Sequence, residues 1–320
     1  MEILAALFLD ALLGDPKHVP HPVAGIGTIV LFWEKRLYPG ADKRRQGLLF
    51  CAAVLTTTLA VVAGILSCAS FLGSFIPGLY EIAVLYLLYS ALAWRSLKDH
   101  SLPVALALFR GELAAAREKL SHIVGRDTQS LDEAGILRAV IETIGENFID
   151  GVFSVLFFMA LGYAWGEAAG AVFAAWFFKG ASTLDSMVGY DDERYRDFGR
   201  AGARLDDVLN FVPARLGGLV VLAAGGCLGY PFSRGLRVFL RDRKKHKSPN
   251  SAHGESAFAG LLGVRLGGGA VYGGVFEERP VIGDPGSRDV EPFDILRAHS
   301  VLDASVAFSA LILYFIAVAS

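Results

Sequence analysis

The sequence predicts an all-α integral membrane protein that crosses the bilayer about five times. Hydrophobic residues make up 53% of its 320 positions and charged residues only 19%, below the roughly 25% of ordinary soluble domains. The apolar residues are also clustered, since no Asp, Glu, Lys or Arg occurs between Arg45 and Glu81. A helix needs about 20 apolar residues to cross a bilayer, and this stretch is long enough to do so.

Several apolar segments along the chain are expected to span the membrane as helices. A buried helix of a soluble protein would explain any one of them, but not all of them together. Residues 3–13 are also apolar but too short for a span. The expected spans are residues 48–72, 79–94, 152–178, 216–232 and 304–319.

Two arrangements remain open for the segment 152–178, because Glu167 interrupts it among glycines. The segment either crosses the membrane once or folds back as two half-length helices around residues 162–170. Glutamate is a poor lipid-facing residue but fits a turn, which favours the second arrangement. Residues 179–207 then return to the side of the membrane from which the segment started, whereas a single crossing would put them on the opposite side.

Two basic clusters predict how the chain is oriented in the cell membrane. Residues 43–45 are Lys-Arg-Arg, and residues 241–247 are rich in arginine and lysine. Such clusters face the cytoplasm, so we expect a multi-pass protein whose polar segments, where the active site is expected, are mostly cytoplasmic. The sequence has no internal repeat, and we expect a single domain over residues 1–320.

The sequence shows no cleavable signal peptide, disulfide framework or cysteine metal site. The amino terminus has no basic region before its apolar run, and Cys51, Cys68 and Cys227 all lie in apolar segments. The net charge of −2 gives no reason to expect a nucleic-acid partner. We expect the lipid bilayer and small molecules as partners, and the oligomeric state, a homo-oligomer included, is left open.

A charged stripe leads into the segment 152–178. Its members recur every fourth residue and therefore share one face of a helix. A solvated face with ion pairs between turns would explain this pattern. Carboxylates so close to a membrane are costly without partners, so Glu146, Asn147 and Asp150 are also candidate ligands for Mg²⁺. The stripe consists of Arg138, Glu142, Glu146 and Asp150, with Asn147 at its edge.

An arginine-rich region occupies residues 179–215, where arginine, aspartate and tyrosine alternate directly beside apolar segments. Arginine binds phosphate and carboxylate oxygens through two parallel N–H groups, which indicates an anionic ligand. Ion pairs that lock helices together are the alternative, and the two explanations are compatible. The candidate ligand-binding residues of this region are Arg194, Arg204, Asn210 and Arg215.

A proline-stiffened turn at residues 14–22 carries Asp15, His18 and His21 at the end of the first apolar segment. Its side chains either cap the membrane interface or bind a ligand. Metal binding by the two histidines is the less favoured interpretation, because no third ligand lies nearby at a recognised spacing.

The polar stretch at residues 246–274 contains Ser-Pro-Asn-Ser, with Asn250, and a glycine-rich run that begins beside Arg265. Short polar side chains on a turn can donate hydrogen bonds to a ligand, and glycines let backbone N–H groups approach a phosphate. Taken alone this signal is weak, because the chain has no GxxxxGK[ST] phosphate-binding loop.

Motifs in seven segments carry a resemblance to a known family. They are residues 14–22, 146–151, 183–190, 194–199, 204–215, 248–251 and 263–268. In sequence and order they resemble the cobinamide-phosphate synthase family of cobalamin biosynthesis, the CobD/CbiB family, over nearly the whole chain. Two positions depart from the family pattern: Ile149 stands where a small hydroxyl residue is expected, and Gly254 where proline is usual.

That resemblance implies an adenosylcobinamide-phosphate synthase, an ATP-dependent ligase. A carboxylate of adenosylcobyric acid would be activated as an acyl phosphate, then attacked by the amine of (R)-1-aminopropan-2-yl phosphate or ethanolamine phosphate. Mg²⁺ and the arginines would neutralise phosphate charge. Asp185 or Asp207 is the expected base. The expected substrate-binding residues are Asp15, His21, Arg194, Arg204, Asn210, Arg215, Asn250 and Arg265.

Two functions of other classes remain open beside this one. A non-catalytic membrane sensor or regulatory protein is the first, because a related family shares part of the architecture. The second is a corrinoid transporter. Transporters typically contain repeated halves, which this sequence lacks, and a sensor would not need so many polar groups beside its membrane segments.

Overall fold

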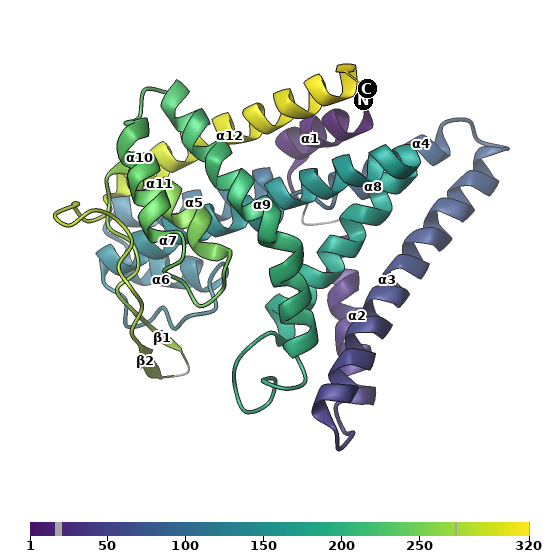
Figure 1. Ribbon diagram of the computed structural model, residues 1–320, viewed down its shortest axis with the longest axis horizontal. Coiled ribbons are helices and arrows are strands. Elements are labelled where there is room, and N and C mark those ends of the chain that lie inside the picture. The colour runs from purple at the N-terminus through teal and green to yellow at the C-terminus, as the bar shows by residue number, and fades with distance from the viewer. Residues whose placement is uncertain (17–20, 273, 320) are drawn as a thin grey trace. The chain divides into compact units, whose positions relative to one another are not determined.

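Helices make up nearly all of the secondary structure, which confirms the all-α prediction (Figure 1). The computed structural model describes residues 1–16, 21–272 and 274–319. Within them, β1 (Ala270–Tyr272) and β2 (Val275–Glu277) form a short antiparallel hairpin. The helices are α1 (Glu2–Leu13), α2 (Pro22–Leu37), α3 (Lys43–Gly73), α4 (Leu79–Tyr89), α5 (Trp94–Phe109), α6 (Leu113–Ser121), α7 (Glu133–Phe148), a π-helical turn (Ile149–Phe153), α8 (Ser154–Val188), α9 (Arg200–Cys227), α10 (Phe232–Asp242), α11 (Ser251–Leu262) and α12 (Pro292–Ala319).

Four helical segments among the described residues are long and apolar enough to cross a membrane, and α4 is a shorter apolar helix. This agrees with a polytopic protein of about five spans. The predicted span 79–94 is shorter than expected, because α4 ends at Tyr89 and a new helix begins at Trp94. The four long segments are Lys43–Gly73, Glu133–Val188, Arg200–Cys227 and Pro292–Phe315.

The chain divides into two compact units, which are described separately. Unit 1 consists of Met1–Ala93 and Val155–Asn210, and unit 2 consists of Trp94–Ser154 and Phe211–Ser320. A single domain over residues 1–320 stays a prediction.

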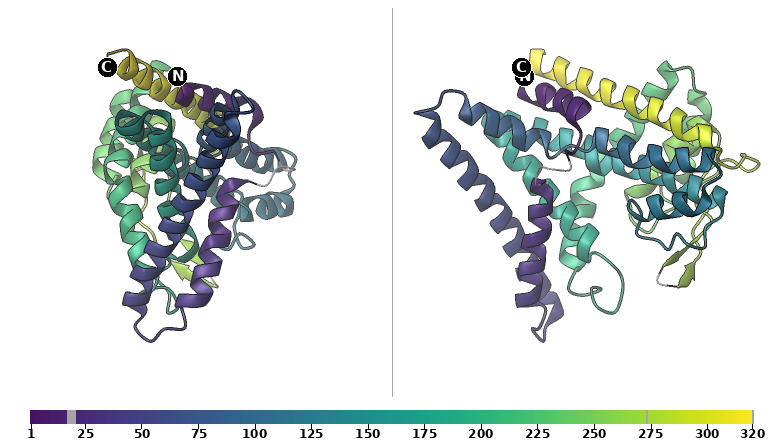
Figure 2. Two further views of the ribbon diagram at one scale, coloured as in Figure 1. Left: turned by 90° about the vertical axis from the view of Figure 1, so that its right-hand side faces the viewer. Right: turned by 180° about the vertical axis from the view of Figure 1, so that it is seen from behind.

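In unit 1, α2 packs along the long helix α3 (Figure 2). The Trp33 indole N–H donates to the Thr57 hydroxyl at 3.0 Å across this contact. At the start of α3, Gly47 touches the backbone of Phe198, since a Cβ at position 47 would lie 2.1 Å from the Phe198 carbonyl oxygen. The Phe50 and Phe198 rings pack 4.7 Å apart. The loop before α9 is therefore held against the first turns of α3.

The helix α8 folds back on itself, which confirms the arrangement favoured for the segment 152–178. The helical conformation breaks at Gly166 and Glu167, where Glu167 has a φ of 52°. The two halves touch through glycine backbones, because a Cβ at Gly162 would lie 2.2 Å from the Gly170 carbonyl oxygen. Only residues without a side chain allow this approach. Glu167 occupies the turn, as its polarity predicts.

In unit 2, α11 packs between α7 and α10. A Cβ at Gly260 would lie 2.8 Å from the Gly235 Cα, so glycines bring α10 and α11 close together. On the other side of the unit, α12 is tied to α5 through Asp303, whose carboxylate accepts hydrogen bonds from Trp94 and Lys98 at 2.8 Å.

Candidate active site

The predicted carboxylate stripe lies on α7 and on the π-helical turn that follows it. Asp132 caps α7 by accepting a hydrogen bond from the Gly135 N–H at 2.7 Å. The helix then widens into Ile149–Phe153, a type of turn that is frequent at functional sites. Since this turn carries Asp150, the stripe ends in irregular backbone rather than in an ordinary helix.

Glu142 does not form the ion pair between turns that a solvated face would have with Arg138. Arg138 instead lies 3.7 Å from Asp289, while Glu142 is only 5% exposed. The stripe therefore has one buried member, and a solvated face does not account for it.

Close contact between α7 and α11 creates the buried part of the site. A Cβ at Gly254 would lie 2.0 Å from the Gly145 carbonyl oxygen, and one at Gly145 would lie 3.0 Å from the Glu255 N atom. The backbones approach this closely only because both positions are glycine. Glycine at 254, the departure from the family pattern noted above, is thus required by this packing. The contact brings Glu255 of α11 beside the carboxylates of α7.

Glu142 is held from two sides. Its Oε2 accepts a hydrogen bond from Arg126 Nη2 at 2.7 Å, and its Oε1 accepts one from the Gly267 N–H at 2.7 Å. The side chains of Arg126 and Glu142 are 13% and 7% exposed. Gly267 belongs to the glycine-rich run, and its N–H group binds this carboxylate rather than being left open for a phosphate.

Glu255 is the most unusual group of the site. It is only 5% exposed, and it forms no hydrogen bond or ion pair with the described part of the chain. Burial raises the pKa of its carboxyl well above the ordinary value, and the neighbouring Glu142 and Glu146 carboxylates raise it further. The Glu255 carboxyl group therefore binds a proton more tightly than an ordinary glutamate does, beside the carboxyl groups of Glu142 and Glu146.

A small cavity joins these groups. Its volume of about 10 Å³ is close to the ~10–15 Å³ that one water molecule needs. Burial lowers the pKa of His246 in its wall, so the ring is neutral at neutral pH. The cavity thus combines proton donors, proton acceptors and guanidinium groups in a nearly dry space. The lining residues are Arg126, Glu142, Lys245, His246, Glu255, Gly267, Gly269, Arg279, Pro280 and Ile282.

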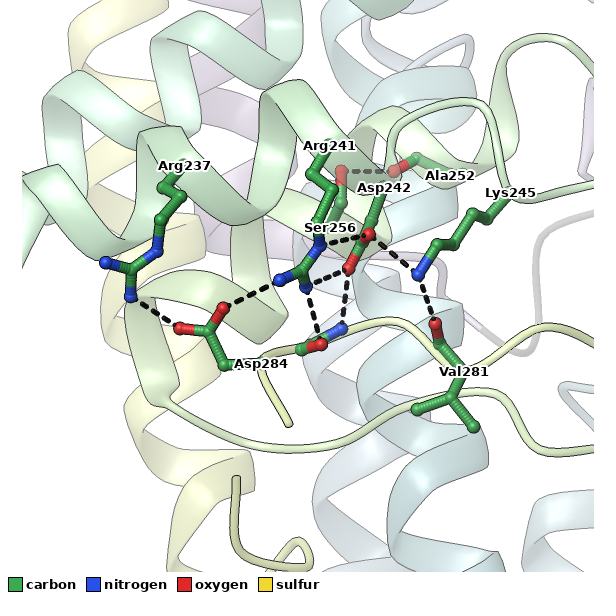
Figure 3. A network of polar contacts seen from close by, with 9 residues as sticks. Arg237, Arg241, Asp242, Lys245, Ala252, Ser256, Val281 and Asp284 are labelled. Carbon is green, nitrogen blue, oxygen red and sulfur yellow. Dashed lines mark hydrogen bonds and ion pairs between the residues drawn. The ribbon is translucent and has the colours of Figure 1, made fainter. Parts of the chain in front are cut away.

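One wall of the cavity belongs to residues 264–272 and 274–290, which we call the strap. Asp242 of α10 anchors the strap by accepting a hydrogen bond from the Gly283 N–H at 2.9 Å. Its carboxylate also lies between Arg241 and Lys245 (Figure 3). Burial opposes ionisation of Asp242, but the hydrogen bonds from Arg241 and Lys245 lower its pKa to about 2. The anchor is therefore ionised at neutral pH and holds the strap closed.

The cavity has room for about one water molecule, so in this conformation it is smaller than any of the expected substrates. The outer part of the anchor consists of Arg237 and Arg241, which both pair with Asp284 of the strap at 2.6 and 2.9 Å (Figure 3). These contacts are more exposed than the contact of Asp242, so less free energy is needed to break them.

Two predicted site residues meet the cavity region at the start of α11. Asn250 Oδ1 lies 3.4 Å from Arg215 Nη1. The next residue, Ser251, donates its hydroxyl proton to Glu146 Oε1 at 2.8 Å. The first turn of α11 therefore links a predicted anion-binding arginine to a predicted metal ligand.

The three predicted Mg²⁺ ligands lie at the end of α7 and in the π-helical turn that follows it. The Asn147 amide donates to the Thr143 carbonyl oxygen at 3.0 Å, which leaves its own oxygen for a ligand. Glu146 and Asp150 are half-buried and one turn apart. Over the described residues, no three His, Cys, Asp or Glu side chains are grouped so as to hold a metal ion. Mg²⁺ commonly uses one or two carboxylates together with substrate phosphates and water, and this donor set fits that mode.

Three further predicted site residues do not line the cavity: Arg265 in unit 2, and Asp15 and His21 in unit 1. Arg265 pairs with Asp289 at 2.9 Å in an ion pair about half exposed. In unit 1, Asp15 Oδ1 lies 3.2 Å from His21 Nε2, and His21 Nδ1 caps α2 by accepting from the Val23 N–H. His18 lies outside the described residues.

In unit 1, the arginine-rich region contains a contact that locks helices together, whereas an anionic ligand there stays a prediction. Arg194 pairs with the buried Glu34 at 2.8 Å, and the Tyr195 hydroxyl donates to the same carboxylate, which is a helix-locking contact. Arg204 is exposed and has no ion pair with the described residues.

The predicted bases of unit 1 lie on two of its helices. Asp185 is on the second half of α8 and Asp207 on α9, where both are half-buried. Asn210 is buried and donates to Asp206 at 3.1 Å.

Sequence reasoning missed five charged or titratable residues of the cavity, which are Arg126, Lys245, His246, Glu255 and Arg279. Glu255 lies four residues after the Ser-Pro-Asn-Ser stretch ends, and its place in a helix of mostly apolar and small residues was an available signal. Arg126 and Arg279 have no local pattern that distinguishes them from surface arginines. Only the packing of α7, α11 and the strap brings them together.

The chain matches the family model described as CobD/Cbib protein over residues 3–302. It is 46% identical over 281 residues to the cobalamin biosynthesis protein CobD of Pelobacter propionicus, covering 88% of this chain and 84% of the relative. The corresponding protein of Desulfotalea psychrophila is 41% identical over 312 residues, covering 94% and 93%. The cobalamin biosynthesis protein CbiB of Salmonella typhimurium is 41% identical over 304 residues, covering 93% and 92%. No solved structure matches the chain. Matched over nearly its whole length, the chain belongs to the CobD/CbiB family of cobalamin biosynthesis proteins.

Proposed function

We propose that this chain is an adenosylcobinamide-phosphate synthase that forms an amide in an ATP-dependent reaction. The carboxylate of adenosylcobyric acid takes the γ-phosphoryl group of ATP, and ADP leaves. The amine of (R)-1-aminopropan-2-yl phosphate, or of ethanolamine phosphate, then attacks the acyl phosphate. The C–N bond forms, inorganic phosphate leaves, and the protein accepts a proton from the amine. Family membership supports the pathway, and the acidic cavity of unit 2 supports the chemistry.

The observation that carries this proposal is the buried set of carboxyl groups around Glu255. An amine is protonated at neutral pH and is not a nucleophile until the proton is removed. Glu142 and Glu146 provide negative charge to attract the ammonium group, and Glu255 can exchange a proton in a cavity with room for about one water molecule. The proton acceptors of this cavity are therefore further candidates for the base, in addition to the predicted Asp185 and Asp207.

Glu146, Asn147 and Asp150 would hold the Mg²⁺ ion that accompanies ATP. Bound there, the ion would neutralise charge on the transferred phosphoryl group. The Glu146 carboxylate is positioned by the Ser251 hydroxyl, which keeps one oxygen oriented before a ligand arrives. The strap completes the site by excluding water, since a reactive acyl phosphate would otherwise hydrolyse.

Purified protein in detergent, incubated with adenosylcobyric acid, the amino-alcohol phosphate, ATP and Mg²⁺, should release the amide product, detected by mass. Omission of ATP or of Mg²⁺ should abolish the product. Glu146→Gln and Asp150→Asn should each lower the rate more than about tenfold, or ~1.4 kcal/mol of transition-state stabilisation. Product formed without ATP would refute the ligase mechanism, and normal rates in both variants would refute the metal site.

We also propose that the basic ends of α3 and α10 face the cytoplasm. The side chain of Arg44 is 68% exposed, and Lys244 is exposed after α10. The positive-inside rule places both on the cytoplasmic side. Ser74, at the opposite end of α3, lies on the other side if α3 crosses the membrane once.

Single cysteines at these three positions, in a chain whose native cysteines are replaced by serine, test the orientation. In intact cells an impermeant thiol reagent should label Ser74→Cys and leave Arg44→Cys and Lys244→Cys unlabelled. After the cells are opened, all three should react. Labelling of Arg44→Cys or Lys244→Cys in intact cells would contradict this orientation.

A further inference from the structure

A second group of polar residues in unit 2, beside the start of α11, is positively charged and contains no carboxylate. Arg215 of α9 stacks on the Phe211 ring, with its guanidinium carbon 3.4 Å from the ring centroid. Its Nη1 reaches the Phe211 carbonyl oxygen and Asn250 Oδ1. A guanidinium group has five N–H donors, and the others on Arg215 have no partner among the described residues.

Arg243 follows α10 and adds a second positive charge next to the first. Its guanidinium carbon lies 5.8 Å from the Phe239 ring centroid, and that ring packs 5.7 Å from the ring of His253 in α11. The Arg243 Nε atom is buried and has no hydrogen-bond partner, and this side chain forms no ion pair with any described residue. Two partly buried arginines that form no ion pair with the described residues are unfavourable until an anion binds.

The first turn of α11 points to the same kind of ligand. Its N-cap residue, Asn250, makes no side-chain capping hydrogen bond, although the first N–H groups of a helix need acceptors. The amino-terminal end of a helix favours an anion through these N–H groups and its partial positive charge.

His253, one turn into α11, lies in the same positively charged surroundings. It is fully buried, and its Nε2 atom has no hydrogen-bond partner. Burial lowers the pKa of its ring to about 4, and the positive charge of Arg215 and Arg243 contributes. The positive charge of the two arginines thus reaches the first turn of α11.

From these contacts we infer that Arg215, Arg243 and the first turn of α11 bind the phosphate group of a phosphate monoester. Arginine pairs match phosphate oxygens with several N–H donors at fixed geometry. The phosphate site itself stands on this geometry alone, whereas the identification of its ligand as the amino-alcohol phosphate rests on the proposed function.

The spacing of the two sites favours that ligand. Arg215 contacts Asn250, and Glu146 contacts Ser251, the next residue of the same turn. A phosphate at Arg215 therefore lies close to the carboxylates around Glu146 and Glu255. An amino-alcohol phosphate has an anionic and a cationic end joined by two carbons, so one molecule can occupy both sites. The phosphate would hold the amine beside the group that receives its proton.

Equilibrium binding to the full-length protein in detergent tests this inference without ATP or corrinoid. The probes are ethanolamine phosphate, inorganic phosphate, ethanolamine, ATP, and nanodiscs containing phosphatidylglycerol. Ethanolamine phosphate should bind more tightly than inorganic phosphate, and ethanolamine much more weakly. Arg243→Ala and Arg215→Ala should each raise the Kd for ethanolamine phosphate at least about tenfold, because each removes a charge-assisted contact.

Arg110→Ala is the matched control, since Arg110 is an exposed arginine of the same unit and should leave the Kd unchanged. Arg243→Lys tests the geometry: it keeps the charge and the fold, but should weaken binding because the planar donor pair is lost. A Kd within twofold of wild type in Arg243→Ala would overturn the phosphate site. Tighter, Arg243-dependent binding of ATP or phosphatidylglycerol than of ethanolamine phosphate would overturn the ligand and assign the site to that molecule.

The two proposals fail separately. Arg243-dependent binding of ethanolamine phosphate by a protein that never forms the amide would overturn the ligase and leave the phosphate site standing. Amide synthesis with a normal KM for the amino-alcohol phosphate in both Arg243→Ala and Arg215→Ala would overturn the phosphate site and leave the ligase standing.

Discussion

A Glu255→Gln variant should form the amide at least about 100-fold more slowly than the wild type, yet unfold at a higher temperature at neutral pH. The rate falls because glutamine cannot exchange a proton, and a positioned acid or base contributes on the order of 10²–10⁴ in rate. Glutamine has nearly the shape of a protonated glutamate. Since Glu255 is only 5% exposed, this substitution changes the proton chemistry while keeping the packing.

The stability gain should depend on pH in a defined direction. The Glu255 pKa is raised in the folded protein above the ordinary value of 4.5. A group with a raised folded pKa binds its proton more tightly when folded, so its contribution is complete below the unfolded pKa and is lost as pH rises. The two melting temperatures should therefore agree near pH 4. The advantage of Glu255→Gln should then grow as pH increases toward the folded pKa.

Glu118→Gln provides the control for both measurements, because Glu118 is an exposed glutamate of α6 in the same unit. It should change neither the rate nor the pH dependence of melting. A Glu255→Gln protein with wild-type turnover would remove Glu255 from the proton transfer. One whose melting temperature stays below that of the wild type from pH 4 to 8 would show that Glu255 is ionised and favourably paired.

Much of the membrane fold could be predicted from the sequence because its signals are local. A run without charge must be buried or face lipid, and a lone Glu167 among glycines is costly anywhere but in a turn. Both expectations hold in α3 and α8. The end of α4 was misjudged because hydropathy continues through residues 90–94. Trp94 instead begins α5, where its indole N–H binds Asp303 of α12, a partner far away in the sequence.

The site was harder to predict because its groups come from distant parts of the chain. The stripe of α7 gave Glu146 from its spacing alone. Glu255 becomes a neighbour only through the contact of Gly145 with Gly254, and a pair of helix glycines has no local signature of packing. Arg126 resembles any loop arginine until Glu142 is seen beside it. Motif resemblance indicated where the important residues lie but not which of them meet.

Replacing Glu142 with glutamine should destabilise unit 2 by about 3–5 kcal/mol, the usual cost of breaking a buried ion pair by removing one partner. The variant keeps the volume of the side chain but leaves the Arg126 guanidinium, 13% exposed, without its carboxylate. It also weakens the contact to the Gly267 N–H, which helps to hold the strap closed. Amide formation should therefore fall together with the melting temperature.

A double replacement distinguishes two causes of instability: a buried Arg126 left without its carboxylate, and the loss of the attraction between Arg126 and Glu142. In Arg126→Met with Glu142→Leu no charge is left unpaired, so stability should return to near the wild-type value, as buried pairs often contribute little net stability. Asp289→Asn serves as the exposed control: its pair with Arg265 is about half exposed on both sides and should change stability by no more than about 1 kcal/mol. Measured in one detergent, the wild type, Asp289→Asn and the double variant should have similar melting temperatures. Glu142→Gln should melt at a much lower temperature than these three. Equal melting temperatures for Glu142→Gln and Asp289→Asn would mean that water reaches Arg126, and the cavity would then be open rather than sealed by the strap.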